Sequence, residues 1–255
     1  MPNPLRIASK TSIGAVCAAL VLLCADTALL QTAMAEEAPP EKRPQAWYPR
    51  TETIGPDEMF VVALGTGMPT PITRAQKSTA WYVELGNGDI FCSTSDRAPL
   101  RPVALRPDFH RVDKIFASHL HTDHVGDAPV VWVGGWLSGR YRPLHIYGPS
   151  GAEPALGTAA YVEGLKKTYA WDIAGRSGIL PDAGGQLIAH EFDYKQDGGV
   201  VYEANGVKIT SFPAVHVIDG PVSYRLEWNG LSFVFGGDWP PPTSGSSNMP
   251  RGPTS

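Results

Sequence analysis

Four side chains that can bind a metal ion fall within six consecutive positions of the sequence. They are His119, His121, Asp123 and His124. Neutral imidazole and carboxylate groups are ligands that Zn²⁺ accepts in proteins. One tetrahedral zinc ion cannot easily use all four from so short a segment, so the spacing favours two adjacent ions. We expect His119 and His121 to bind one ion, and Asp123 and His124 to bind the other.

The residues before this motif indicate how it is positioned. Residues 112–117 form an apolar run that predicts a buried strand, and the loop after a strand can direct several side chains into one pocket. An isolated His-x-His pair would more simply be a solvated polar turn. The full set of ligand types directly after an apolar strand favours metal binding.

The patterns along the rest of the chain predict mainly strands, with helices between them. Strands are expected at residues 59–64, 78–85, 90–91, 144–147, 186–192, 200–203, 207–212, 222–228 and 231–235. Helical patterns cover residues 125–137 and 155–170. The dipeptides Asn205-Gly206 and Asn229-Gly230 are the strongest hairpin signals.

Composition limits the classes of partner. The chain has 255 residues and a formal net charge of −4, so the basic footprint of a general nucleic-acid-binding protein is absent. We therefore expect a small-molecule or ester substrate and no general nucleic-acid binding. The charge and composition do not predict an oligomeric state.

The N-terminus has the pattern of a secretory signal peptide. Arg6 and Lys10 precede an apolar run over residues 13–30, and Ala33-Met34-Ala35 follows. We expect residues 1–35 to be the signal peptide, residues 36–55 a Pro-rich linker, and the mature protein to be periplasmic or secreted. An uncleaved anchor is the alternative. No membrane contact is expected beyond this segment.

Several segments besides the histidine motif resemble the metallo-β-lactamase superfamily over residues 59–238. They are the turn Gly65-Thr66-Gly67, residues 213–216 ending at His216, and the strand end Gly236-Gly237-Asp238. Residues 147–151 resemble the ribonuclease Z and phosphodiesterase-like branch. Residues 136–149 and 222–228 are similar to metallo-hydrolases of guanitoxin biosynthesis.

The resemblance implies an α+β fold, the four-layer αβ/βα sandwich, over residues 56–238. It implies that His216 completes the first metal site and that Asp238 bridges two zinc ions. True β-lactamases of the superfamily commonly use a cysteine at the second metal, and Cys92 has no such position. Asp238 therefore favours the branch that hydrolyses phosphodiesters and other esters.

The sequence departs from the family after Asp238. Only 17 residues follow it, and none is histidine, so the second site has Asp123, His124 and Asp238 alone. We expect the second half of the fold to be incomplete, residues 239–255 to be an irregular tail, and the apolar face of residues 222–235 to lack a cover. A reading-frame error is our explanation there, and again at residues 92–97. One zinc ion, with a second site partly filled, is expected.

These features together predict a zinc-dependent metallo-hydrolase acting on a phosphodiester or related ester through a metal-activated water. Asp123 would orient this nucleophile as well as bind metal. An inactive zinc-binding remnant is the alternative, and a transfer-RNA 3′-processing endoribonuclease is a further one.

Other residues that could do chemistry have simpler interpretations. Three histidines without a motif partner are expected to be structural or on the surface: His110, His145 and His190. Three tryptophans are expected in the core or a pocket wall: Trp132, Trp136 and Trp171. Arg140 and Arg142 are expected in a solvated loop, with anion binding as the alternative.

The signal peptide gives the first testable prediction. Export should be followed by cleavage after Ala35, so N-terminal sequencing of the exported protein should start at Glu36. A soluble cytoplasmic chain that keeps Met1 would contradict this prediction and would favour RNA processing.

Overall fold

The structure is a computed structural model that describes residues 5–8, 53–67, 78–94 and 110–238. Its first sheet has the strand order β1-β2-β3-β4-β5-β6-β7. These strands are β1 (Leu5–Ala8), β2 (Glu58–Gly65), β3 (Ala80–Leu85), β4 (Ile90–Cys92), β5 (Lys114–Phe116), β6 (Leu144–Pro149) and β7 (Leu187–Phe192). Strands β1 to β4 are antiparallel, whereas β4 to β7 are parallel.

The second sheet is antiparallel and has the order β11-β10-β9-β8. Its strands are β8 (Gly199–Ala204), β9 (Val207–Pro213), β10 (Val222–Trp228) and β11 (Leu231–Phe235). The two predicted hairpin turns join them. Asn205, Gly206, Asn229 and Gly230 all have positive φ angles, between 48° and 76°, as a two-residue type I′ turn requires.

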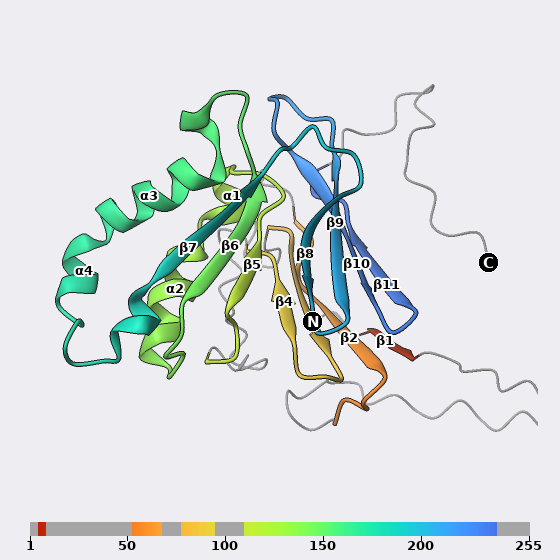
Figure 1. The fold of residues 1–255 in the computed structure, drawn as a ribbon, viewed down its shortest axis with the longest axis horizontal. Helices are drawn as coiled ribbons and strands as arrows, with labels where there is room; N and C mark the ends of the chain where they lie inside the picture. The colour runs from red at the N-terminus through yellow and green to blue at the C-terminus, as the bar shows by residue number, and fades with distance from the viewer. Residues whose placement is uncertain (1–4, 9–52, 68–77, 95–109, 239–255) are drawn as a thin grey trace, which may run out of the picture.

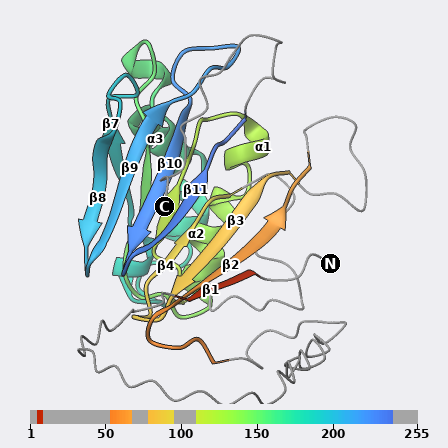
Figure 2. The same cartoon turned by 90° about the vertical axis from the view of Figure 1, so that its right-hand side faces the viewer.

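The helices lie on one side of the first sheet and the second sheet lies on the other (Figures 1 and 2). They are α1 (Thr122–Val125), α2 (Ala128–Leu137), α3 (Thr158–Thr168) and α4 (Ala170–Ala174), with the 3₁₀ turns η1 (Pro154–Leu156) and η2 (Asp182–Gly185). The helix predicted at 125–137 is divided, because Val125 is the last residue of α1 and α2 begins at Ala128. The one predicted at 155–170 is divided into η1, α3 and α4, with Tyr169 between the two α-helices.

Alternating side chains of the first sheet enter two separate cores. Phe60 and Val62 of β2 pack with Trp132 and Val162 of the helices. Met59 and Val61, on the opposite face of the same strand, pack with the second sheet. A strand that is apolar on both faces is the expected pattern for a sheet covered on both sides.

The fold class is confirmed: the described residues form an α+β arrangement of helices, sheet and second sheet. The expectation that residues 222–235 present an uncovered apolar face is wrong. Val222, Tyr224 and Leu226 point into the core between the sheets, and each is at most 4% exposed. The opposite face of β10 instead carries Ser223, Arg225 and Glu227, because strand side chains alternate between faces.

Strand β1 pairs antiparallel with β2 at the edge of the first sheet. It lies in the segment expected to be a signal peptide, so a chain cut after Ala35 would lack it. The proposed cleavage site, most of the linker and the tail at 239–255 are outside the described residues. No helix in the described part is long and apolar enough to cross a bilayer.

Two of the expectations for tryptophan and arginine need correction. Trp132 and Trp136 are in the core as predicted, at 1% and 0% exposure, but Trp171 on α4 is 86% exposed. Arg140 is fully buried, which overturns the expectation of a solvated loop. Arg142 is exposed in a loop, as expected, and donates to the carboxylate of Asp113 at 2.8 Å.

Arg140 links the turn after α2 to α2 itself and to η2. Its guanidinium donates to the carbonyl oxygens of Val131, Trp132 and Gly184 at 2.7 to 2.9 Å. Burial lowers the pKa of this side chain to about 10, so it stays charged at neutral pH. A buried cation is tolerable because main-chain carbonyl oxygens replace its water.

Replacing Arg140 by Met should therefore destabilise the chain by about 2–4 kcal/mol, because several buried carbonyl groups lose a charged donor. The matched control is Arg176→Met, which removes only a surface pair with Asp172 at 2.8 Å and should cost about 0.5 kcal/mol. Urea unfolding measures both. Equal, small losses would contradict the role given to Arg140.

Candidate metal centre

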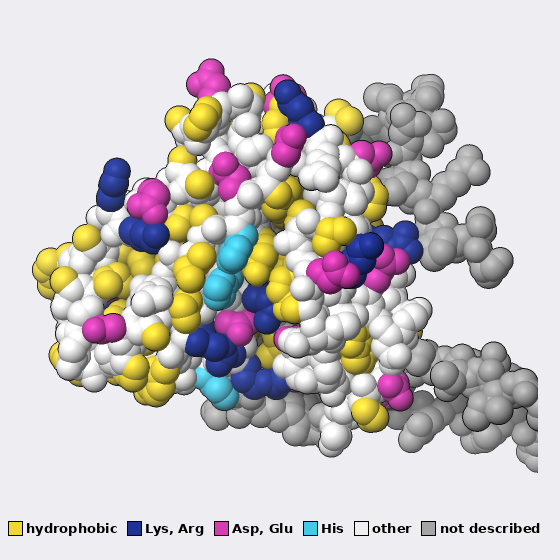
Figure 3. Space-filling view, viewed as in Figure 1, with side chains coloured by type: hydrophobic (Ala, Val, Ile, Leu, Met, Phe, Trp, Pro, Cys, Tyr) yellow, Lys and Arg dark blue, Asp and Glu magenta, His cyan; other side chains and the backbone are white. Residues whose placement is uncertain are grey.

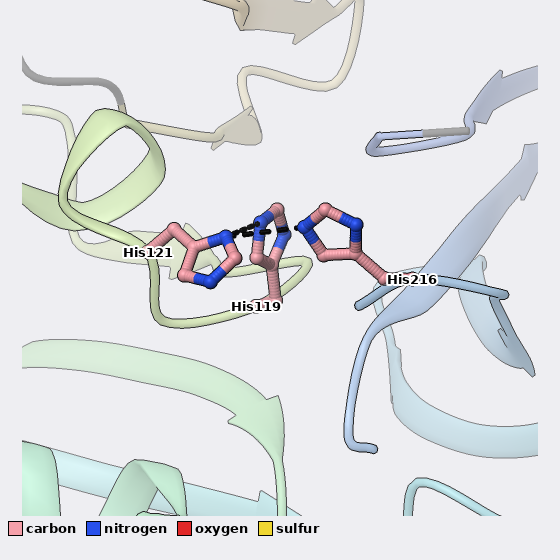
Figure 4. A group of neighbouring side chains, drawn as sticks. All are labelled: His119, His121 and His216. Carbon is pink, nitrogen blue, oxygen red and sulfur yellow. Dashed lines mark hydrogen bonds between the residues drawn. The ribbon is translucent and has the colours of Figure 1, made fainter. Parts of the chain in front are cut away.

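The predicted ligands lie together beside the ends of strands from both sheets, and Figure 4 shows three of them, His119, His121 and His216. His119 follows β5, and His121 is the residue just before α1. His216 lies in the loop that leads from β9 to β10, and Asp238 follows β11. The first sheet and the second therefore each contribute part of the site.

The first group consists of His119, His121 and His216. The Nδ1 atom of His121 lies 3.1 Å from Nε2 of His119 and 3.1 Å from Nε2 of His216. One ring nitrogen from each residue lies within 4.8 Å of the others. Three imidazoles in this arrangement leave a fourth position for water, which is the usual plan of a catalytic zinc site.

A second group is made by His119, His124 and Asp238, so His119 belongs to both. The Nε2 atom of His124 is 3.1 Å from Oδ1 of Asp238 and 3.4 Å from Oδ2 of Asp123. Asp123 is 6% exposed and contacts the second group without belonging to either set. All six sequence-predicted ligands thus lie in one cluster, and their roles in binding metal stay predictions.

Ser118 was not predicted as a site residue, but its side chain contacts two of the clustered histidines. Its hydroxyl lies 3.1 Å from Nδ1 of His119 and 3.5 Å from Nδ1 of His124. Gly237 has a φ of +63°, and a Cβ there would be 3.0 Å from Cβ of Ser118. Because only glycine fits comfortably, the end of β11 can bring Asp238 close to the histidines. In the sequence, only the position of Ser118 directly before His119 indicated that it could belong to the site.

Burial sets the charge state of the centre. Loss of water around His119, followed by the neighbouring imidazoles of His124 and His121, lowers its pKa to about 3. The hydrogen bond from His124 lowers the pKa of Asp238 below its usual value. At neutral pH the cluster therefore presents a neutral His119 and an ionised Asp238, the protonation states that bind a metal cation.

The remaining candidate ligands lie outside the cluster. His145 and His190 are paired at 2.7 Å, and the His190 ring stacks on Tyr147 at 4.3 Å between centroids. Cys92 is buried, and its thiol donates to the carbonyl oxygen of Lys114. Burial raises the pKa of this thiol to about 12. A thiol that stays protonated is a poor metal ligand, consistent with the expectation for Cys92.

Comparison with known proteins identifies similar sequences, although no family model matches the chain. Ribonuclease Z of Mycolicibacterium gilvum is 31% identical over 196 residues, covering 71% of this chain and 62% of its own length. Ribonuclease BN of Escherichia coli is 31% identical over 144 residues, which are 53% of this chain and 46% of that protein. The chain thus spans less than two thirds of the curated relatives it matches.

The architecture also has a solved counterpart. The crystal structure of the short form of human tRNase Z superposes with a TM-score of 0.55 and 17% sequence identity. The superposition covers 70% of this chain and 68% of the human one. At this identity the match establishes the fold alone, which is the metallo-β-lactamase fold. The narrower resemblance to guanitoxin-type hydrolases stays a prediction.

These relatives contradict the expectation of no general nucleic-acid binding, because proteins named ribonucleases act on RNA. Net charge was a poor guide, since it averages over the whole chain whereas a substrate meets only one site. The chain is therefore similar in sequence to ribonuclease Z over 71% of its length, and it has the metallo-β-lactamase fold.

Proposed function

We propose that this protein is a zinc-dependent hydrolase that cleaves phosphodiester bonds, with RNA as its substrate class. The observation that carries the proposal is the convergence of His119, His121 and His216 beside His124 and Asp238. The similarity to ribonucleases over 71% of the chain supports the choice of RNA.

The donor set fits zinc better than the harder cations. Magnesium and calcium prefer sites built from oxygen, whereas three imidazole nitrogens are typical of zinc. His119, His121 and His216 would hold the first ion. His124 and Asp238, with Asp123 in contact, would hold a second, and this pair offers fewer ligands.

The chain's own groups prepare the site for hydrolysis. A bound divalent ion supplies a nucleophilic water at neutral pH and positive charge for the transition state. Ser118 orients the rings of His119 and His124 through their Nδ1 atoms. Asp123, buried beside His124, would accept a proton from the attacking water and align it.

The charge on the surface bears on how RNA would be held. On the face in Figure 3, Lys and Arg side chains are interspersed with Asp and Glu rather than gathered in one basic patch. Bulk electrostatic attraction to phosphates is therefore weak on that face. Recognition would depend more on contacts near the metal centre than on a broad basic surface.

Zinc content gives the first test. The purified chain should hold about one zinc ion, because three imidazoles and water complete a tetrahedron. His121→Ala should lose most of it, whereas His190→Ala, which removes an imidazole outside both ligand groups, should keep it. Elemental analysis after dialysis measures the content. An undiminished zinc content in His121→Ala would refute the assignment.

Hydrolysis gives the second test. The zinc-loaded chain should cleave bis(p-nitrophenyl) phosphate and a transfer-RNA precursor, and chelation should abolish both activities. Asp123→Asn should lower kcat by about 100-fold or more, because the proton acceptor is lost. Asp172→Asn, on the surface of α4, is the matched control. A chain that binds zinc yet leaves both substrates intact would be an inactive remnant instead.

A further inference from the structure

A separate pocket opens directly beside the first histidine group. Its volume is about 210 Å³, and His119 and His121 form one wall. Leu156 of η1, Ser150 after β6, and Ile218 and Asp219 of the loop between β9 and β10 form the others. A group attached to a bond cleaved at the metal centre would therefore lie close to this space.

The walls of the pocket are fixed by main-chain contacts rather than by loose side chains. The amide of Ala214 donates to the carbonyl oxygen of Pro221 at 2.9 Å and closes the β9–β10 loop. Gly220 adopts a φ of +129°, and a Cβ there would lie 3.4 Å from the carbonyl oxygen of Ser150. The amide of Ser150 is in turn held by the carbonyl oxygen of Phe192 at 2.7 Å. The β9–β10 loop and the segment after β6 therefore pack against each other through main-chain contacts and enclose the pocket.

The glycine at position 151 explains why Leu156 can reach the rim. A Cβ on Gly151 would lie 2.6 Å from Cβ of Leu156, so only glycine allows η1 to come this close. Leu156 and Ile218 remain 50% and 48% exposed there. Exposed apolar groups around a pocket are typical of a binding site.

The lining determines which part of a substrate could enter. Among the described residues that line the pocket, Asp219 is the one side chain besides the two imidazoles that can carry charge, and none is Lys or Arg. A phosphate group would meet a carboxylate there without a compensating cation. The volume is below the range of about 300–1,000 Å³ that holds a whole drug-sized ligand. The pocket is therefore suited to a single flat, uncharged ring system.

We propose that this pocket is a nucleobase subsite next to the scissile phosphodiester. Leu156 and Ile218 would pack against the faces of the base, and Asp219 would accept a hydrogen bond from its exocyclic amino group. A carboxylate that accepts from an amino group selects cytosine, adenine or guanine over uracil, which lacks one. The inference rests on the proposed function, because it takes RNA as the substrate.

Binding of free nucleosides tests the subsite without any hydrolysis. The full zinc-loaded chain should bind cytidine about tenfold more tightly than uridine, as measured by NMR titration, because the hydrogen bond to Asp219 is charge-assisted. Asp219→Asn should reduce this preference to about twofold or less. Binding that is equal for the two nucleosides, or absent for both at millimolar concentration, would overturn the proposal.

A matched pair of variants tests the apolar walls of the pocket. Ile218→Asp should weaken cytidine binding at least about tenfold, because it places a second carboxylate against the base. Val217→Asp makes the same change one position earlier, at a side chain that is 85% exposed and does not line the pocket. It should bind cytidine as the unaltered chain does. Equal loss in both variants would show that the wall at Ile218 has no special role.

Cleavage separates failure of the subsite from failure of the proposed function. Short RNAs that differ only in the base next to the cleaved bond should be hydrolysed about tenfold faster with cytosine than with uracil. Hydrolysis at equal rates would overturn the subsite and leave the hydrolase proposal intact. Selective nucleoside binding without hydrolysis of any phosphodiester would overturn the proposed function alone.

Discussion

The metal centre depends on the face-to-face packing of the two sheets, because its ligands come from both of them. His119, His121 and His124 follow β5 of the first sheet, whereas His216 and Asp238 follow β9 and β11 of the second. Separating the sheets would separate the ligands. The apolar core between them is therefore the interaction on which the site rests.

Two hydrogen bonds fix the sheets at the end where the ligands lie. The amide of Val222 donates to the carbonyl oxygen of Ser118 at 2.9 Å, and the hydroxyl of Tyr224 donates to that of Ala117 at 2.6 Å. Both run from β10 to the segment that carries the histidines. Tyr224 is buried, so losing its partner would leave an unsatisfied polar group in the core. These two bonds thereby fix the position of the second sheet relative to the first at the site.

Gathering imidazoles in a partly buried cluster is unfavourable until a cation joins them. Burial of His119 and the proximity of His121 and His124 keep its pKa well below the usual value for histidine, so it cannot charge without cost. A bound metal ion would convert these crowded lone pairs into favourable contacts. Folding and metal binding are coupled in such sites, because the ligands are positioned only in the folded chain. The same loops that bring in His216 also build the pocket beside it.

The sequence by itself determined the local features. The motif that follows β5, the strands of the second sheet and the turns at Asn205 and Asn229 were predictable because periodicity and turn chemistry act over a few residues. The resemblance to a known family pointed further, to His216 and Asp238. Net charge misled, since it describes no particular surface.

Only the tertiary structure decided which distant segments meet. His216 lies beside His121 although 95 positions separate them in the sequence, and Gly237 passes close to Ser118, which brings the following Asp238 to His124. Helical periodicity could not tell that Trp171 faces solvent, nor could composition tell that Arg140 is fully buried against main-chain carbonyl oxygens. These outcomes depend on contacts between elements far apart in the chain, and a local pattern carries no information about such contacts.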